Sequence, residues 1–346
     1  MSLETTDAQS NRLAPGPLGL GGRRLDYVSL ALSFVAMTGL ILDIRKHSDG
    51  FSFAEEGFFT PEHTVFYGGF LAVLGLMLVV VYGRRTSGGL SWVDAVPPGY
   101  GVGIFGLLLF ALGGPGDFVW HTLYGVENGD EALVSPTHLL LVCGGALFVS
   151  SPIRAAWRRE TPATWAATLP VLAATGLFAT VPLAFTMYAN PAFLGAGLQP
   201  AIGQGLGGFV VHATILAALV VPLARRFTFP LGGYTVTFAL VGVAIGYLAQ
   251  PSVLAPYLAA GVVADVLTAR LDAGRDSRGL RLVAVAVPTV WALTYFLVVE
   301  ALGTIVWTVH VWTGAIALSA LAGLCLSFVV VPSPHAPPST RSGDEV

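Results

Sequence analysis

The sequence carries two copies of a residue pattern that is typical of metal-binding sites. Each copy has an aspartate, a histidine four positions later and a second histidine further along the chain: Asp43, His47 and His63, then Asp117, His121 and His138. Residues four positions apart on a helix share one face and lie about 6 Å apart, so each aspartate and its first histidine should converge. Each second histidine follows a Thr-Pro or Ser-Pro pair, which favours a helix start with the histidine in its first turn. The pattern therefore predicts two sites, each built where one helix ends and the next begins.

The side chains of each copy indicate which ions they could bind. Two neutral imidazoles and one carboxylate suit copper, iron(II) or zinc better than calcium or magnesium, which prefer oxygen ligands. Three protein ligands also leave a coordination position open, as a catalytic metal requires. An acidic pair precedes the second histidine in both copies, and its carboxylates are secondary candidates: Glu55 and Glu56, then Asp130 and Glu131.

Each copy taken alone also has an explanation without a metal. A histidine at a membrane edge is usually a solvated side chain, and Pro-His after a hydroxyl residue is often only a helix start. The duplication favours the metal interpretation, because two such strings in equivalent places indicate an internal repeat. Ionisable side chains in a membrane carry an insertion cost of about 2.5–3.5 kcal/mol at the bilayer centre, so a cluster of them needs a compensating partner.

The composition places these residues in a membrane protein. Of the 346 residues, 54% are hydrophobic and 11% are charged, whereas ordinary soluble domains carry about 25% charged residues. Long apolar runs predict an all-α polytopic membrane helical bundle of about ten transmembrane helices, with an internal repeat in the first four. The candidate spans are 26–43, 63–83, 98–116, 135–152, 165–187, 205–224, 230–249, 252–269, 282–300 and 304–329.

The arginines alternate between connections, and this alternation predicts the orientation of the chain. The alternate connections contain only Arg45 and Lys46 as cations. By the positive-inside bias, both termini are cytoplasmic and the metal sites lie on the extracytoplasmic side. The arginines that carry the bias are Arg12, Arg23, Arg24, Arg84, Arg85, Arg154, Arg158, Arg159, Arg225, Arg226, Arg270, Arg275, Arg278 and Arg281. The expected organisation is a cytoplasmic tail at 1–24, a duplicated helix-pair module at 25–152, a six-helix membrane module at 153–331 and a disordered cytoplasmic tail at 332–346.

Around these residues the sequence resembles the C subunit of the copper membrane monooxygenases, the particulate methane and ammonia monooxygenase family. That subunit has an Asp-x3-His motif, often with Trp before the His, which leads into a Thr-Pro-x-His helix start. Asp117, Trp120, His121 and His138 are similar to the first part, and the segment 59–67 is similar to the helix start. The resemblance implies that the Asp and His residues of both copies are copper ligands, and that oxygenase activity depends on partner subunits.

Four further ionisable residues lie in the later spans. His212, Glu300 and His310 fall in the outer half of the predicted bilayer, where they could extend a site or relay protons. Each could equally be structural, through a hydrogen bond to a neighbouring helix. Asp265 lies toward the cytoplasmic end of its span, and we expect it to pair with a nearby arginine.

Three functions are compatible with these features. The first is a copper-dependent oxidoreductase that acts on oxygen or on a small apolar or gaseous substrate arriving from the bilayer. The second is a transporter or metal-handling protein that uses the His and acid cluster as an ion path, and the third is a sensor or assembly factor without turnover. The inner halves of the spans are apolar apart from Asp265, which favours a one-sided site. Expected partners are the lipid bilayer and partner subunits or a homo-oligomer, whereas the net charge of −3 excludes nucleic acid.

Overall fold

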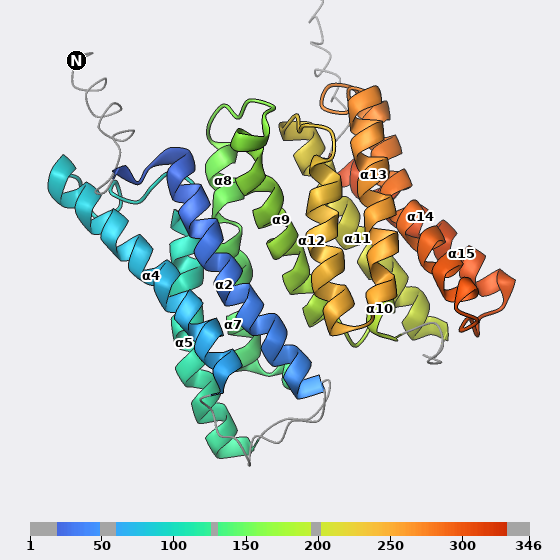
Figure 1. Ribbon diagram of the computed structural model, residues 1–346, viewed down its shortest axis with the longest axis horizontal. Coiled ribbons are helices and arrows are strands. Elements are labelled where there is room, and N and C mark those ends of the chain that lie inside the picture. Colours follow the sequence, from blue (N-terminus) through green and yellow to red (C-terminus); the bar gives the residue numbers. More distant parts are fainter. Residues whose placement is uncertain (1–18, 49–59, 126–130, 195–201, 331–346) are drawn as a thin grey trace, which may run out of the picture.

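The protein is an all-α polytopic membrane bundle (Figure 1). The computed structural model describes residues 19–48, 60–125, 131–194 and 202–330, and within these ranges it contains helices and no strands. Nine of the described helices are long and apolar enough to cross a membrane. The elements are α2 (Gly22–Ser48), α4 (Pro61–Gly88), α5 (Gly101–Tyr124), α6 (Glu131–Val134), α7 (Pro136–Val149), α8 (Ser151–Trp157), α9 (Trp165–Phe185), α10 (Pro191–Leu194), α11 (Ile202–Arg226), α12 (Gly233–Leu248), the 3-10 turn η2 (Pro251–Val253), α13 (Leu254–Arg270), α14 (Ser277–Ala301) and α15 (Val309–Val330).

Each of the ten predicted spans appears as a helical segment. Helix α7 continues into α8, and η2 continues into α13, so that each of these forms one full-length span, whereas α12 is short. Helix α12 has 16 residues and extends about 24 Å at 1.5 Å per residue, less than the roughly 30 Å of a bilayer core. The predicted span 230–249 begins too early, because Leu231 and Gly232 form a turn in which the amide of Gly233 donates to the carbonyl of Pro230. Gly232 has φ 92°, a left-handed conformation that suits glycine.

The described helices form two hydrophobic cores that share α9. Helices α2, α4, α5 and α7 lie on one side of the bundle and α11 to α15 lie on the other, with α9 between them (Figure 1). Ala174 and Leu177 of α9 pack in the first core, whereas Val171 and Leu183 pack in the second. Outward-facing side chains such as Leu78 are more than half exposed, as expected where lipid replaces water.

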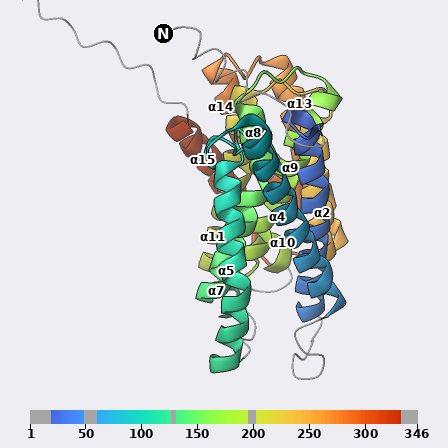
Figure 2. The same cartoon turned by 90° about the vertical axis from the view of Figure 1, so that its left-hand side faces the viewer.

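Helix α2 packs antiparallel to α4, and α5 packs antiparallel to α7. Within each pair, the two helices approach each other closely at a glycine. A Cβ atom on Gly69 would lie 2.4 Å from the amide nitrogen of Ala36, and one on Gly144 would lie 2.7 Å from the carbonyl oxygen of Gly106. Gly69 and Gly144 each follow the second histidine of their copy by six positions. The two sequence copies therefore fold into two helix pairs with equivalent close contacts, and α5 and α7 lie side by side in Figure 2 as well.

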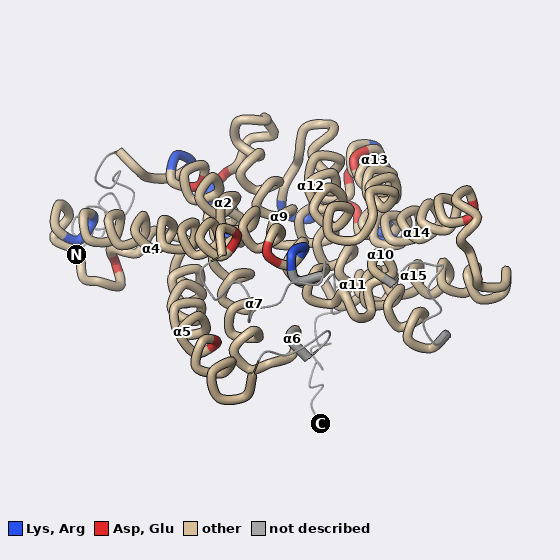
Figure 3. The backbone as a smooth tube through the Cα atoms, turned by 60° about the horizontal axis from the view of Figure 1, so that its bottom comes forward, with Lys and Arg blue, Asp and Glu red and all other residues tan. Residues whose placement is uncertain are grey.

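The charged residues divide the bundle into two ends. The ends of α4, α8, α11 and α13 lie together at the end we call the arginine end, whereas α2, α5 and α9 finish at the opposite, histidine end (Figure 1). Figure 3 shows that Lys, Arg, Asp and Glu gather near the helix ends and leave long uncharged stretches between them. At the arginine end the buried carboxylate of Asp26 accepts a hydrogen bond of 2.7 Å from the Tyr100 hydroxyl and pairs with Arg159.

Candidate metal centre

The last turns of α5 supply an aspartate and a histidine on one helix face. Asp117 is buried, and its Oδ2 lies 3.2 Å from Nε2 of His121, one turn further along. Gly125, with φ 83°, ends the helix, and its amide donates to the carbonyl of His121. The i,i+4 geometry predicted from the sequence is thus present in this copy.

The start of α7 returns a second histidine to the same place. Ser135 is the N-cap, Pro136 follows it, and the backbone amide of His138 donates to the Ser135 hydroxyl. The predicted helix start is confirmed by this cap. The Ser135 hydroxyl also lies 2.7 Å from Nδ1 of His138, so it helps to orient the imidazole as well as the backbone.

The Asp117 carboxylate lies between the two imidazoles. Its Oδ1 is 3.7 Å from Nδ1 of His138 and accepts a hydrogen bond of 2.8 Å from the Thr137 hydroxyl. One ligand atom from each of Asp117, His121 and His138 lies within 4.8 Å of the others. The two contacts use different carboxylate oxygens: Oδ2 faces Nε2 of His121 at 3.2 Å, and Oδ1 faces Nδ1 of His138 at 3.7 Å. Ligands bound at about 2.0–2.2 Å to one tetrahedral ion lie roughly 3.4 Å apart, so side-chain rotations would draw the three ligand atoms together around an ion. We call these three residues the triad.

The two ring nitrogens of His121 each face an oxygen. Nδ1 lies 3.3 Å from the carbonyl oxygen of Gly125, and Nε2 lies 3.2 Å from Oδ2 of Asp117. A neutral imidazole carries one ring proton, so one nitrogen donates to its oxygen and the other presents a lone pair. With the proton on Nδ1, the Nε2 lone pair would face the space beside Asp117, which is the arrangement that a metal ion would use.

The first copy forms a matching but smaller cluster in the described residues. Thr60 caps α4 and accepts the amide of His63, whose Nε2 lies 3.3 Å from Oδ1 of Asp43 on α2. Lys46 and Glu62 form an ion pair of 3.3 Å beside them. His47 belongs to the last turn of α2, but its side chain lies outside what the structure describes, so this copy is seen as an Asp–His pair.

The remaining candidates lie outside the triad. Glu55, Glu56 and Asp130 fall outside the described residues, and Glu131 is in α6 without a described side chain. Among the described residues, the one group of three convergent ligands contains none of His212, Glu300 and His310. His212 is buried in α11 and stacks on Trp291 with ring centroids 3.8 Å apart, whereas Glu300 and His310 are exposed.

The expectation that Asp265 pairs with an arginine is wrong. Its carboxylate accepts the backbone amides of Tyr234 and Thr235, each at 2.9 Å, and the Thr235 hydroxyl at 2.6 Å. Asp265 therefore joins α13 to the first turn of α12, where free amides need acceptors. Asp265 lies about 30 positions after Tyr234 and Thr235 in the chain, so the local sequence gave no indication of this pairing.

Two neighbours of the candidate ligands were not predicted as site residues. The Thr137 hydroxyl contacts Asp117 directly, and the ring centroid of Tyr67 on α4 lies 5.9 Å from that of His63. A Cβ atom on Gly114 of α5 would lie 3.3 Å from the Tyr67 ring, so Tyr67 lies between the two copies. Thr137 occupies the position between Pro136 and His138 at the helix start. Its polar side chain, next to a candidate ligand, was the sequence feature that could have indicated a site residue.

The helices define the class of this protein, a multi-pass all-α membrane protein, and the triad is its candidate site. Comparison with known proteins finds no matching family model, curated protein or solved structure. The function proposed below is therefore argued from the triad and its surroundings.

Proposed function

We propose that the protein is a membrane metalloprotein that holds a transition-metal ion, copper in our proposal, on Asp117, His121 and His138. The observation that carries the proposal is the convergence of two imidazoles and a buried carboxylate within 4.8 Å at the junction of α5 and α7. The donor set fits copper, iron(II) and zinc, and its one charged oxygen and two nitrogens fit calcium and magnesium poorly.

The residues around the triad support ligand roles rather than a simple ion pair. The Gly125 carbonyl faces Nδ1 of His121, the nitrogen turned away from Asp117, and the Thr137 hydroxyl donates to Asp117. Such outer hydrogen bonds fix the direction of metal-binding side chains. The Ser135 hydroxyl contacts Nδ1 of His138, so this histidine would bind an ion through Nε2 or would exchange the Ser135 contact for the ion. Because α5 and α7 are in direct contact, the three donors are held before an ion arrives, which lowers the ordering entropy that binding must overcome.

The site supports an oxidoreductase subunit better than an ion path. A copper ion held by Asp117, His121 and His138 would keep an open position for oxygen or a small substrate. Asp265, the one ionisable residue noted in the inner halves of the predicted spans, accepts three hydrogen bonds from the start of α12. Transport therefore remains the weaker proposal.

Metal content tests the proposal directly. Purified protein loaded with copper, zinc or iron and then desalted should retain about one ion per chain at the triad, measured by elemental analysis. His121→Ala and His138→Ala should each lose that ion, because one of three ligands is removed. His310→Ala is the matched control, since this histidine is exposed and lies outside the triad.

The first copy is tested with the same assay. If His47 completes a second triad, wild-type protein should hold two ions and His63→Ala should lose one of them.

Equal metal content in wild type, His121→Ala and His138→Ala after all three loadings would overturn the metal proposal. Copper-dependent oxygen consumption, absent in His121→Ala, is the expected sign of the oxidoreductase role.

A further inference from the structure

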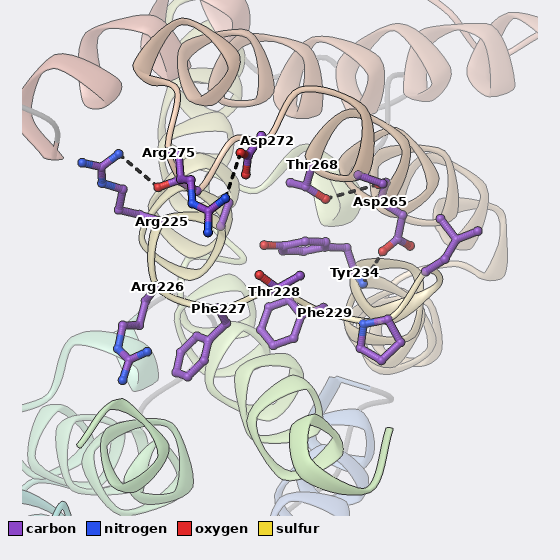
Figure 4. A pocket seen from close by; sticks show the side chains of 15 residues that line it. Arg225, Arg226, Phe227, Thr228, Phe229, Tyr234, Asp265, Thr268, Asp272 and Arg275 are labelled. Carbon is purple, nitrogen blue, oxygen red and sulfur yellow. Dashed lines mark hydrogen bonds and ion pairs between the residues drawn. The ribbon is translucent and has the colours of Figure 1, made fainter. Parts of the chain in front are cut away.

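A cavity of about 440 Å³ lies at the arginine end, opposite the triad. It is formed by the end of α11, the connection to α12, the last turns of α13 and the connection to α14 (Figure 4). Its volume falls in the range of about 300–1,000 Å³ that is usual for small-molecule sites. The residues that define its chemistry are Arg225, Arg226, Arg275, Thr228 and Tyr234.

The lining of this cavity contains one more positive than negative side chain. It has three arginines and two aspartates, Asp265 and Asp272. Arg225 donates to the carbonyl of Gly274, and Arg226 donates to backbone carbonyls, so within the described part of the chain neither forms an ion pair. Arg275 lies 3.6 Å from Asp272, but both side chains are more than half exposed and the pair is weak. In Figure 4 the side chains of Arg225 and Arg226 point away from the cavity, so Arg275 is the guanidinium that an anion inside it would meet.

Tyr234 gives an independent indication of a ligand. Its side chain is 2% exposed, yet among the described residues its hydroxyl has no hydrogen-bond partner. Buried tyrosine hydroxyls usually have one. In Figure 4 the ring extends across the cavity and directs its hydroxyl toward the space beside Thr228 and Arg275. The hydroxyl is therefore in position to donate to an acceptor oxygen inside the cavity.

The rim of the cavity is apolar on the side away from the arginines. Phe229, Pro230 and Leu231 belong to the lining, and Leu231 is 72% exposed. An exposed leucine in the turn before α12 suits contact with acyl chains. The cavity thus places the Arg275 guanidinium and the Tyr234 hydroxyl beside an apolar edge.

We propose that this cavity binds a phosphate group, with Arg275 and Tyr234 as the principal contacts. The phosphate is either that of an anionic phospholipid headgroup or free phosphate from solution, since both present the same oxygens to these side chains. The arginine bias assigns this end of the bundle to the cytoplasmic side, where anionic headgroups are abundant.

The test uses the whole protein in nanodiscs of phosphatidylcholine with and without phosphatidylglycerol, followed by native mass spectrometry of the lipids that remain bound. Wild type should retain one phosphatidylglycerol per chain. Arg275→Gln should weaken retention about tenfold or more, and Tyr234→Phe about three- to tenfold, because each removes one donor. Arg278→Gln is the control of equal charge, since Arg278 is exposed at the same end but does not line the cavity.

A second arm distinguishes the two sources of phosphate. If inorganic phosphate raises the melting temperature of wild type but not of Tyr234→Phe, and phosphatidylglycerol is not retained, the site is one for soluble phosphates. Both variants keep exposed or isosteric side chains, so their melting temperatures without ligand should match wild type. The proposal is overturned if neither probe binds, or if Arg278→Gln weakens binding as much as Arg275→Gln does.

Discussion

The contact between α5 and α7 leads to a prediction about metal affinity that changes no ligand. Gly144 faces α5 so closely that a Cβ atom there would lie 2.7 Å from the Gly106 carbonyl oxygen and 2.8 Å from the Phe110 amide nitrogen. These are backbone atoms and cannot rotate away. In Gly144→Ala the two helices must therefore move apart.

The displacement can be worked from the structure. Ordinary contact begins at 3.4 Å, so the helices must separate by about 0.7 Å near Gly144. His138 lies six residues away, about 9 Å along the helix, and metal–ligand distances tolerate only about 0.2 Å of error. We expect Gly144→Ala to lower the free energy of unfolding by about 1–3 kcal/mol and to weaken metal binding about 10–100-fold.

The assay compares Gly144→Ala with Gly145→Ala in detergent. A Cβ atom on Gly145 meets nothing within 4 Å, so this control adds the same methyl group without a clash. Zinc affinity is measured by competition with a chelator, because zinc is redox-silent, and stability is measured by thermal melting. If the two variants have the same affinity and the same melting temperature, the packing argument is refuted.

Three further predictions concern other parts of the bundle. Gly69→Ala should destabilise the α2–α4 pair while Gly68→Ala should not, because a Cβ atom clashes with backbone at the first position and meets nothing within 4 Å at the second; both should keep the ion at the triad, as elemental analysis would show. Two backbone amides at the start of α14 hold the pKa of Asp276 below its usual 3.8, so its contribution to stability is complete above about pH 3.8 and lost as the pH falls through the lowered pKa. Asp276→Asn, a comparable cap, should remove this pH dependence of the melting temperature, whereas Asp276→Ala should lower the melting temperature at neutral pH. Asp26→Ala should lower the free energy of unfolding by about 1–3 kcal/mol, because Tyr100 and Arg159 lose their buried acceptor. A chemical denaturation series that finds no change would contradict a stabilising role for these two contacts.

Local sequence was sufficient to predict the helices and the frame of the triad. Long apolar runs specify membrane helices because the bilayer leaves backbone groups no other way to satisfy their hydrogen bonds. The Ser-Pro and Thr-Pro starts act within one turn, and the Asp117–His121 spacing is a property of a single helix. These features depend on neighbours in the chain, which is why they could be predicted.

Features that depend on contacts between distant helices could not be predicted. Asp265 binds the start of α12, and His212 stacks on Trp291, and neither partner is close in sequence. The short length of α12 follows from a turn at Leu231 and Gly232 within an otherwise apolar run. A hydropathy profile assigns Leu231 and Gly232 to the span, because it depends on side-chain polarity and contains no information on backbone conformation.

The position of α9 between the two cores constrains the order in which the protein can be assembled. Membrane helices leave the ribosome from the N-terminus onward, so α2, α4, α5 and α7 enter the bilayer before α9, which packs against them, exists. Ala174 and Leu177 fill the interior of that first group, and Val171 and Leu183 of the same helix fill the second. A fragment that stops before α9 would leave the first core without these side chains, and one that extends through Phe185 would still lack Leu240 of α12, which packs against the same core. The helix pair that carries the triad is therefore synthesised first but packed last.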